Sequence, residues 1–418
     1  IAPAGSDARI KYESTLASLA NYAKNFGSMI ESYNKGDMLE RKQAELQALQ
    51  QWINSSKQRK NKYAKALTEL NALIAQGKKG QERDLLMGYL GSTNMMSVAK
   101  RLYRLANEKT KSDTERKQGY QDRDMNRFTQ GMKRVNRRYD ATVDKAVLEH
   151  FIGLYAQLPK KERNATFDKY FGIGKNFDAK KLAAKLDMMH KNTKLDEEAM
   201  RLAWMNKSVS EFKNSKDPYI QFAVSQYDND RKLEKKAEAL FGKLAQARPA
   251  FMEAMIAYKK SKGEPVYADA NSSLRITYGN VMGYSPQDGI TATPFTTLEG
   301  LLAKYKAGDA EFDLFDNIRK AIADKNYGKY YRKDLDSVPV NYLSNLDITG
   351  GNSGSPTLNG KGEFVGLVFD GVYESIIGDW DYDTKYKRAI HTSVPFMLWT
   401  MENIDGAQNI VDEMTIVK

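Results

Sequence analysis

Apolar residues recur at helical spacing through most of the first 250 positions of this chain. The clearest run has an apolar residue about every 3.6 positions, the period of an α-helix, and Pro159 follows its end. Asp37 can cap a further helix, and Gly77-Lys-Lys-Gly80 predicts a turn between two others. We therefore predict an antiparallel helical domain over residues 1–255. The run comprises Met125, Phe128, Met132, Val135, Tyr139, Val143, Val147, Phe151 and Leu154.

The pattern changes after Pro249, where proline and glycine become denser and short alternating segments replace the helical spacing. We place a junction between Pro249 and Tyr267. Residues 256–418 are expected to form a β-rich domain with a helical insertion and a terminal helix, so the fold class is α+β. The predicted strands are Leu274–Tyr278, Phe364–Phe369 and Arg388–Val394, and the predicted helical segments are 297–325 and Phe396–Ile404.

Composition excludes several kinds of chemistry. The chain has no cysteine, which rules out thiol catalysis, disulfides and cysteine-based zinc sites. Its three histidines, His150, His190 and His391, are far apart in sequence, so we expect no histidine-rich metal site and no cofactor. No apolar run reaches 18 residues, so no membrane span is predicted. The net charge of +12 would suit a polyanion, but no dense basic block interleaved with aromatics favours nucleic acid.

One segment, Thr349-Gly-Gly-Asn-Ser-Gly-Ser-Pro356, has the composition of a loop around a nucleophilic serine. A serine nucleophile needs backbone N–H groups aimed at the substrate oxygen, because the tetrahedral intermediate carries negative charge there. Glycines at 351 and 354 allow the tight turn that exposes such groups. We predict Ser353 as the nucleophile and the amides of Gly351 and Ser353 as the oxyanion hole. An ordinary glycine-rich turn is the alternative.

A strand-like segment from Glu363 to Asp370 follows this loop and ends in Gly371. The combination resembles chymotrypsin-like serine peptidases, in which a Gly-Asp-Ser-Gly-Gly-Pro loop precedes a strand that walls the S1 pocket. Three motifs are similar, more particularly, to the bacterial dipeptidyl-peptidases 7 and 11. This resemblance covers nearly the whole chain, with its strongest motifs in about the last 75 residues. The motifs are Gly350-Gly-Asn-Ser-Gly-Ser-Pro356, Gly366-Leu-Val-Phe-Asp-Gly371 and Gly378-Asp-Trp-Asp-Tyr-Asp383.

The resemblance implies removal of dipeptides from the free N-termini of peptides, by a chymotrypsin-like double β-barrel with an inserted helical cap. It also implies a homodimer in the bacterial periplasm or at the cell surface. Asp370 matches the aspartate that binds the substrate's ammonium group, and a carboxylate suits that cation. An asparagine of the helical domain is expected beside it, with Asn25 as the first choice and Asn21 as the second. Gly371 implies an open, uncharged S1 pocket and cleavage after hydrophobic residues, since the form that prefers Asp or Glu carries arginine there.

The chain departs from the resemblance in its general base. A serine hydroxyl needs a base, usually a histidine oriented by a carboxylate. We expect His150 to be packed in the helical core and His190 and His391 to be structural. We therefore expect the chain alone to lack the catalytic His and Asp, and to be the C-terminal part of a longer peptidase whose first barrel is missing or supplied separately. Further departures are Thr392-Ser-Val-Pro395 and Ala23.

Two other functions stay open at this point. The chain could be a catalytically incomplete homologue that binds peptides between its helical cap and its β-domain. It could also be a basic helical scaffold for nucleic acid, which would require an affinity that falls steeply with salt.

Overall fold

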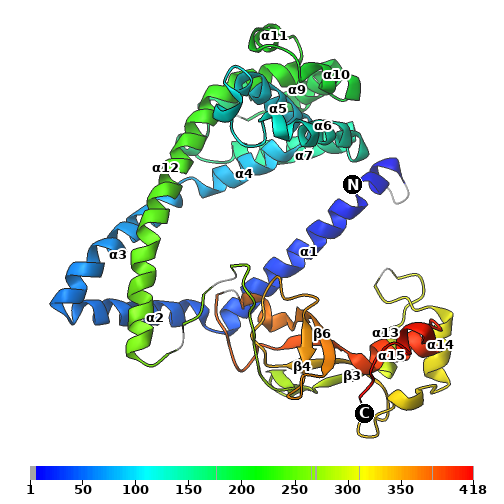
Figure 1. Cartoon of the computed structure of the whole chain (residues 1–418). Helices are drawn as coiled ribbons and strands as arrows, with labels where there is room; N and C mark the ends of the chain where they lie inside the picture. Colours follow the sequence, from blue (N-terminus) through cyan, green and yellow to red (C-terminus); the bar gives the residue numbers. More distant parts are fainter. Residues whose placement is uncertain are drawn as a thin grey trace. The chain divides into compact units, whose positions relative to one another are not determined.

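The computed structural model describes residues 6–175, 177–264, 266–268, 271–309, 311–378 and 380–417 (Figure 1). Asp379, within one of the three motifs, lies outside the described residues. The described chain combines many helices with a small antiparallel sheet, so the predicted α+β class is confirmed. Contacts divide it into two compact units, one of Ile1–Ser18 with Gln47–Val266 and the other of Leu19–Leu46 with Tyr267–Lys418.

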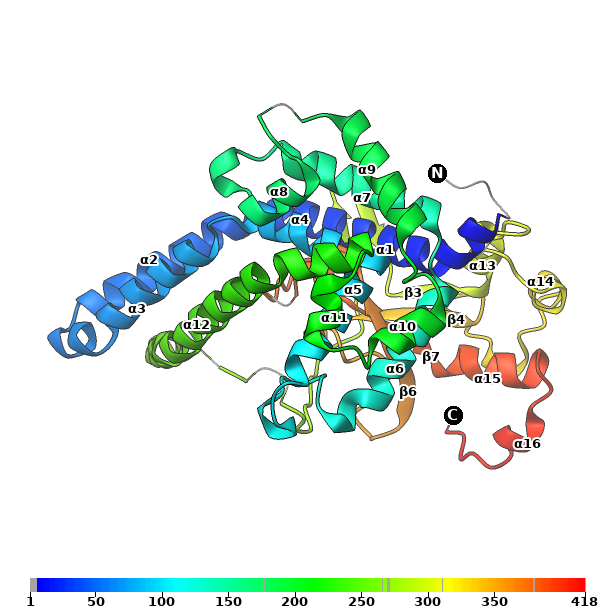
Figure 2. The same cartoon turned by 90° about the horizontal axis from the view of Figure 1, so that it is seen from above.

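Helices make up the first part of the chain. Apolar residues on several of them form one large core, to which α5 contributes buried residues along most of its length, and α12 packs along both α5 and α3 (Figure 2). The helices are α1 (Asp7–Lys35), α2 (Met38–Asn54), α3 (Lys57–Gly77), α4 (Gln81–Ser92), α5 (Asn94–Glu108), α6 (Met125–Arg134), α7 (Ala141–Ala156), α8 (Ala165–Phe171), α9 (Ala179–Asn192), α10 (Glu198–Trp204), α11 (Val209–Asn214) and α12 (Pro218–Ser261).

The long apolar run that ends near Leu154 forms two helices and not one. A short 3-10 helix, Val135–Arg137, follows α6, and Asp140 then starts α7 by accepting the backbone N–H groups of Thr142 and Val143. The break changes the helical phase. In α7 the fully buried side chains include Leu148 and Ile152, each one position beyond the predicted Val147 and Phe151.

The junction predicted between Pro249 and Tyr267 contains the end of α12 at Ser261 and the boundary of the two compact units between Val266 and Tyr267. Pro249 lies inside α12, which continues to Ser261, so the boundary placed at residue 255 falls within a helix. The division into a helical domain 1–255 and a β-domain 256–418 stays a prediction, since the compact units have other bounds.

The second unit contains a five-stranded antiparallel sheet in the order β3-β4-β7-β6-β5 and a separate hairpin of β1 and β2. The predicted strands 364–369 and 388–394 and the predicted helix 396–404 are present, whereas in the described chain the predicted helical segment 297–325 forms two short helices, 298–304 and 316–323, and not one continuous helix. A closed barrel is not confirmed, because β3 and β5 are the edges of the described sheet. The elements are β1 (Tyr284–Gln287), β2 (Ile290–Ala292), β3 (Phe295–Thr297), α13 (Leu298–Lys304), α14 (Asp316–Ala323), β4 (Pro339–Ser344), β5 (Pro356–Leu358), β6 (Phe364–Gly371), β7 (Ala389–Ser393), α15 (Val394–Asn403) and α16 (Gln408–Val411).

The segment Leu274–Tyr278 is not a strand, contrary to its alternating pattern. A strand needs a hydrogen-bonded neighbour, and in the described chain this segment has no strand partner; the nearest bridge joins Val281 to Ser344. Its apolar side chains are therefore exposed: Leu274 is 91%, Ile276 is 83% and Tyr278 is 91% exposed.

The second half of α1 belongs to the same unit as the sheet and contacts the turn after β6. The Ser28 hydroxyl donates to the carbonyl of Tyr373 at 3.0 Å, and the Tyr373 hydroxyl donates to Glu31 at 2.9 Å. An ion pair of 3.1 Å joins Lys35 to Glu374. These contacts place one face of α1 against the residues that follow Gly371.

Replacing Ser28 with leucine should therefore detach α1 from this turn. Ser28 is only 5% exposed, so the larger side chain has no room, and we expect a loss of about 1–3 kcal/mol in the free energy of unfolding. Ser18→Leu on the exposed face of α1 is the matched control and should cost far less. Urea unfolding and hydrogen exchange of residues 371–378 measure the effect. Equal stability of the two variants would contradict this packing.

Candidate active-site serine

Ser353 lies in a tight loop between β4 and β5. Gly351 and Gly354 have φ values of +101° and +83°, a region that side chains rarely tolerate. The Asn352 side chain closes the turn by accepting the backbone N–H of Thr349 at 3.1 Å, and the Asn352 N–H donates to the Thr349 carbonyl at 3.2 Å. The positive φ at both positions thus explains why the motif has glycine there.

Hydrogen bonds fasten this loop to strand β6. The Gly354 N–H donates to the carbonyl of Val368 at 2.8 Å, and the Val368 N–H donates to the carbonyl of Ser355 at 3.1 Å. The exposed Ser353 hydroxyl donates to the carbonyl of Phe369 at 3.3 Å. Because Phe369 precedes Asp370 and Gly371, the structure brings the predicted nucleophile beside the two predicted substrate-binding residues of β6.

The two predicted oxyanion-hole amides are free to bind a ligand. Neither the Gly351 N–H nor the Ser353 N–H donates a hydrogen bond within the described chain, although the neighbouring amides of Asn352, Gly354 and Ser355 all do. Unpaired N–H groups beside an exposed hydroxyl are the arrangement that stabilises a developing oxyanion. Their role in catalysis stays a prediction.

Asp370 and Gly371 end strand β6. The Asp370 carboxylate is exposed, accepts the Gly371 N–H at 2.7 Å, and forms no ion pair within the described residues, so it can receive a cation. A Cβ at Gly371 would lie 3.0 Å from the Cβ of Ser375, so a side chain at this position requires that neighbour to move. Ser375 contacts Arg388, the residue before β7, with its hydroxyl 2.9 Å from the Arg388 N–H and 3.2 Å from the Arg388 carbonyl.

Ser375 is a residue that the sequence analysis missed. It belongs to the short 3-10 helix Tyr373–Ile377, and its partner Arg388 is distant in sequence. No local pattern marks such a contact, since it arises from the pairing of β6 with β7.

Asn25 and Asn21 lie on the same face of α1 as Ser28, because the three positions are spaced by three or four residues. Asn25 is half-buried and Asn21 is exposed. The structure records no hydrogen bond from either side chain to Asp370 among the described residues. Their assignment to substrate binding stays a prediction.

His391 cannot serve as the base for Ser353. Its ring is fully buried, with Nε2 at 2.7 Å from the Ser344 hydroxyl and Nδ1 at 2.8 Å from the Thr357 hydroxyl. It also stacks on the Tyr342 ring at 4.5 Å between centroids. Burial lowers the pKa of His391 to about 4. The imidazole is therefore a neutral bridge between β4, β7 and β5, in keeping with the structural role expected for it.

The other two histidines lie in the helical unit. His190 is packed, with Nδ1 2.9 Å from the Leu186 carbonyl and 3.1 Å from the Tyr219 hydroxyl. His150 is exposed, so the expectation that it packs in the core is wrong: the phase change in α7 turns it outward and leaves it against the Phe151 ring. No described histidine is hydrogen-bonded to Ser353.

The described residues contain no group of three or more acidic, His or Cys side chains arranged to hold a metal ion. Among the same residues, no helix is long and apolar enough to cross a membrane.

Comparison with known proteins identifies a family. The Peptidase S46 family model matches residues 1–416. An Asp/Glu-specific dipeptidyl-peptidase of Shewanella putrefaciens is 36% identical over 99% of this chain and 58% of its own length. A dipeptidyl-peptidase 7 of Capnocytophaga gingivalis is 30% identical over 98% of this chain and 56% of its own. The chain thus spans a little over half the length of these relatives.

A solved structure is similar in fold. The crystal structure of Porphyromonas endodontalis DPP11 in complex with the dipeptide Arg-Glu matches with a TM-score of 0.73 and 25% identity. The match covers 97% of this chain and 56% of that one.

The buried His391 predicts a pH-dependent stability. Its pKa of about 4 in the folded chain lies below the ordinary value of 6.5, so protonation favours the unfolded state. The contribution of His391 to the free energy of unfolding is therefore largest above pH 6.5. It falls by up to about 3 kcal/mol as the pH drops toward 4.

Urea unfolding at pH 7.0 and 4.5 measures this dependence. In His391→Gln the free energy of unfolding should fall less between pH 7.0 and pH 4.5 than it does in the wild type. His150→Gln, which alters an exposed histidine, should show the same fall as the wild type. The same pH dependence in all three proteins would overturn the assignment.

Proposed function

This chain belongs to the Peptidase S46 family, and from that membership we propose that it carries the nucleophilic half of a serine dipeptidyl-peptidase acting on peptides with a free N-terminus. The observation that carries the proposal is the loop around Ser353: an exposed hydroxyl next to two unpaired amides. The names of the relatives support the dipeptidyl-peptidase activity.

The steps follow from the positions of these groups. The Ser353 hydroxyl attacks the carbonyl of the second residue of the peptide, and the Gly351 and Ser353 amides take the negative charge of the tetrahedral intermediate. The Asp370 carboxylate binds the peptide's ammonium group, which limits the product to a dipeptide. Asn25, or failing it Asn21, completes that ammonium site. Collapse of the intermediate breaks the peptide C–N bond, releases the rest of the peptide as an amine that takes the proton from the general base, and leaves the dipeptide acylated on Ser353. Water then attacks this ester, which frees the dipeptide and restores the Ser353 hydroxyl.

The proton of Ser353 needs an acceptor. We propose that a histidine and an aspartate from a polypeptide segment other than these 418 residues supply it. Support comes from the bonding of His391 to two hydroxyls and from the greater length of the relatives. A homodimer, and a location in the bacterial periplasm or at the cell surface, remain proposals that follow from the family resemblance alone.

Labelling with a fluorophosphonate probe tests the nucleophile. The complete encoded polypeptide should be labelled at Ser353, and Ser353→Ala should abolish labelling and lower kcat/KM for dipeptidyl substrates at least about a thousandfold. Ser355→Ala, two residues away in the same loop, is the matched control and should keep both properties. An inert wild-type protein that still binds peptides would favour a catalytically incomplete, peptide-binding homologue.

At the P1 position we propose a preference for hydrophobic residues. It rests on Gly371, which adds no charge to the end of β6. The names of the relatives do not support this preference, since several are called Asp/Glu-specific. The proposal therefore depends on a residue of this chain and not on its relatives.

Dipeptidyl substrates that end in Leu or Phe should be turned over faster than those that end in Asp or Glu. Gly371→Arg should shift the ratio of kcat/KM toward the acidic substrates by tenfold or more, because the guanidinium can pair with their carboxylate. Gly371→Ala crowds Ser375 without adding charge and should leave the ratio unchanged. Faster turnover of acidic substrates by the wild type would refute the preference.

A further inference from the structure

Four cationic side chains surround a small hollow inside the helical unit, far in sequence from the Ser353 loop. Its volume is about 140 Å³. A water molecule occupies about 30 Å³ of liquid, so the hollow holds a ligand of only a few heavy atoms. Helices α5 and α12 supply most of the lining, which consists of Lys100, Arg101, Arg104, Tyr120, Ala223, Tyr227, Asp230 and Arg231.

Each of these cations lies over an aromatic ring, which fixes its position. The distances from the charged group to the ring centroid are 4.9 Å for Arg101 over Phe128 and 5.2 Å for Arg104 over Tyr120. Both are within the range of a cation–π contact. Lys100 and Arg231 lie at 5.5 Å over Phe222 and Tyr227. The rings hold the cations in place without neutralising them.

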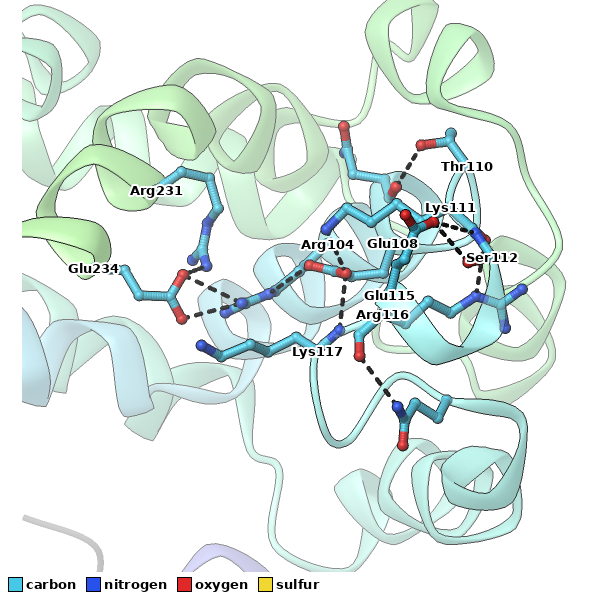
Figure 3. A network of polar contacts seen from close by, with 12 residues as sticks. Arg104, Glu108, Thr110, Lys111, Ser112, Glu115, Arg116, Lys117, Arg231 and Glu234 are labelled. Atoms are coloured by element: carbon cyan, nitrogen blue, oxygen red, sulfur yellow. Dashed lines mark hydrogen bonds and ion pairs between the residues drawn. The ribbon is translucent and has the colours of Figure 1, made fainter. Parts of the chain in front are cut away.

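Carboxylates compensate three of the four cations. Lys100 pairs with Asp230 at 2.9 Å. Figure 3 shows the Glu234 carboxylate between Arg104 and Arg231, and it accepts from the Arg104 Nη2 at 3.0 and 3.2 Å and from the Arg231 Nη1.

Arg101 is the exception. Within the described chain its guanidinium has no ion pair and no hydrogen bond, although burial lowers its pKa. It lies against α6 at Gly131, where a Cβ would come within 3.1 Å of Nη2. A glycine at that position makes the room that the guanidinium occupies.

Two further N–H groups beside the hollow are buried and lack a hydrogen-bond acceptor, the Nε atoms of Arg104 and Arg231. The nearest carboxylate oxygen to Arg104 Nε, from Glu108, is 3.6 Å away, beyond hydrogen-bond distance. Buried donors of this kind are costly and usually have a partner. Each of the three arginines that line the hollow thus has at least one N–H group without an acceptor among the described residues.

The local charge is positive. Besides the four lining cations, Lys111 lies 2.7 Å from Glu108, so five described cations are opposed by the carboxylates of Glu108, Asp230 and Glu234. The cations therefore exceed the carboxylates by two charges. A phosphate group carries about that much negative charge at pH 7 and offers oxygen acceptors to several arginines at once.

We propose that this hollow is a binding site for a phosphate group, with Arg101 as its principal ligand and Arg104 and Arg231 as neighbouring cations. The site is independent of the proposed peptidase function. The phosphate belongs either to the free ion or to a small phosphate monoester.

Calorimetric titration of the 418-residue chain with inorganic phosphate, at constant ionic strength and pH 7.5, tests the site. We expect saturable binding of one phosphate per chain. Arg101→Gln should raise the Kd at least tenfold, since charge-assisted hydrogen bonds are lost. Arg134→Gln makes the same change on an exposed face of α6 and should not alter the Kd. Arg101→Lys, which keeps the charge but not the planar fork, should give an intermediate value.

Titrations with two other ligands, phosphoserine and acetate, identify the source of the phosphate and test whether the site prefers phosphate to a carboxylate. Phosphoserine binding more tightly than inorganic phosphate would identify a monoester, and the reverse order would identify the free ion. Acetate should bind at least tenfold more weakly than either. Absence of saturable phosphate binding, acetate binding as tight as that of phosphate, or wild-type affinity in a folded Arg101→Gln protein would each overturn the proposal. Circular dichroism melting checks folding, and Arg101→Lys serves if Arg101→Gln does not fold.

Discussion

The reciprocal pair of backbone hydrogen bonds between the serine loop and Val368 is the constraint on which the candidate site depends. One runs from the Gly354 N–H to Val368, and the other from Val368 to Ser355. They hold the loop in register with β6, so Ser353 comes to lie beside the residues that end that strand. The two glycines with positive φ allow the chain to reach this register while the amides of residues 351 and 353 stay unpaired. Any change that moves β6 along its neighbour β7 would move the nucleophile with it.

A second constraint is the separation of polar groups between exposed and buried positions of the same sheet. His391 has the chemistry of a general base, yet both of its nitrogens are engaged by hydroxyls of neighbouring strands and its pKa is held low by burial. Among the described residues, the exposed side chains of Ser353 and Asp370 have no partner beyond a backbone carbonyl and a backbone amide. The buried polar side chains around His391 therefore join the strands of the sheet, whereas the exposed side chains of Ser353 and Asp370 remain available to a ligand.

Local features of the sequence predicted the site loop and the strands beside it, because glycine spacing and alternation are direct consequences of backbone geometry. Features that depend on distant contacts could not be predicted in this way. The pattern of Leu274–Tyr278 is that of a strand, but the described chain provides no partner for it. Asp140 divides the apolar run near residue 140 because capping competes with helix continuation, and periodicity alone does not register that competition.

The same limit applies to charged residues. A net charge of +12 says little about where charge is uncompensated. Arg101 differs from the exposed arginines of α6 through its surroundings: a ring below it, a glycine beside it and no ion pair within the part of the chain that the structure describes. Such an imbalance is a property of packed helices and becomes visible only in three dimensions.

The exposed segment Leu274–Tyr278 has a consequence for the behaviour of the chain in solution. A segment with three exposed apolar side chains and no strand partner among the described residues is adhesive, since another copy can add to it as a strand. Arg275 interrupts this segment with a charge, as gatekeeper residues do in segments prone to self-association. We therefore expect Arg275 to limit self-association of the chain through this segment.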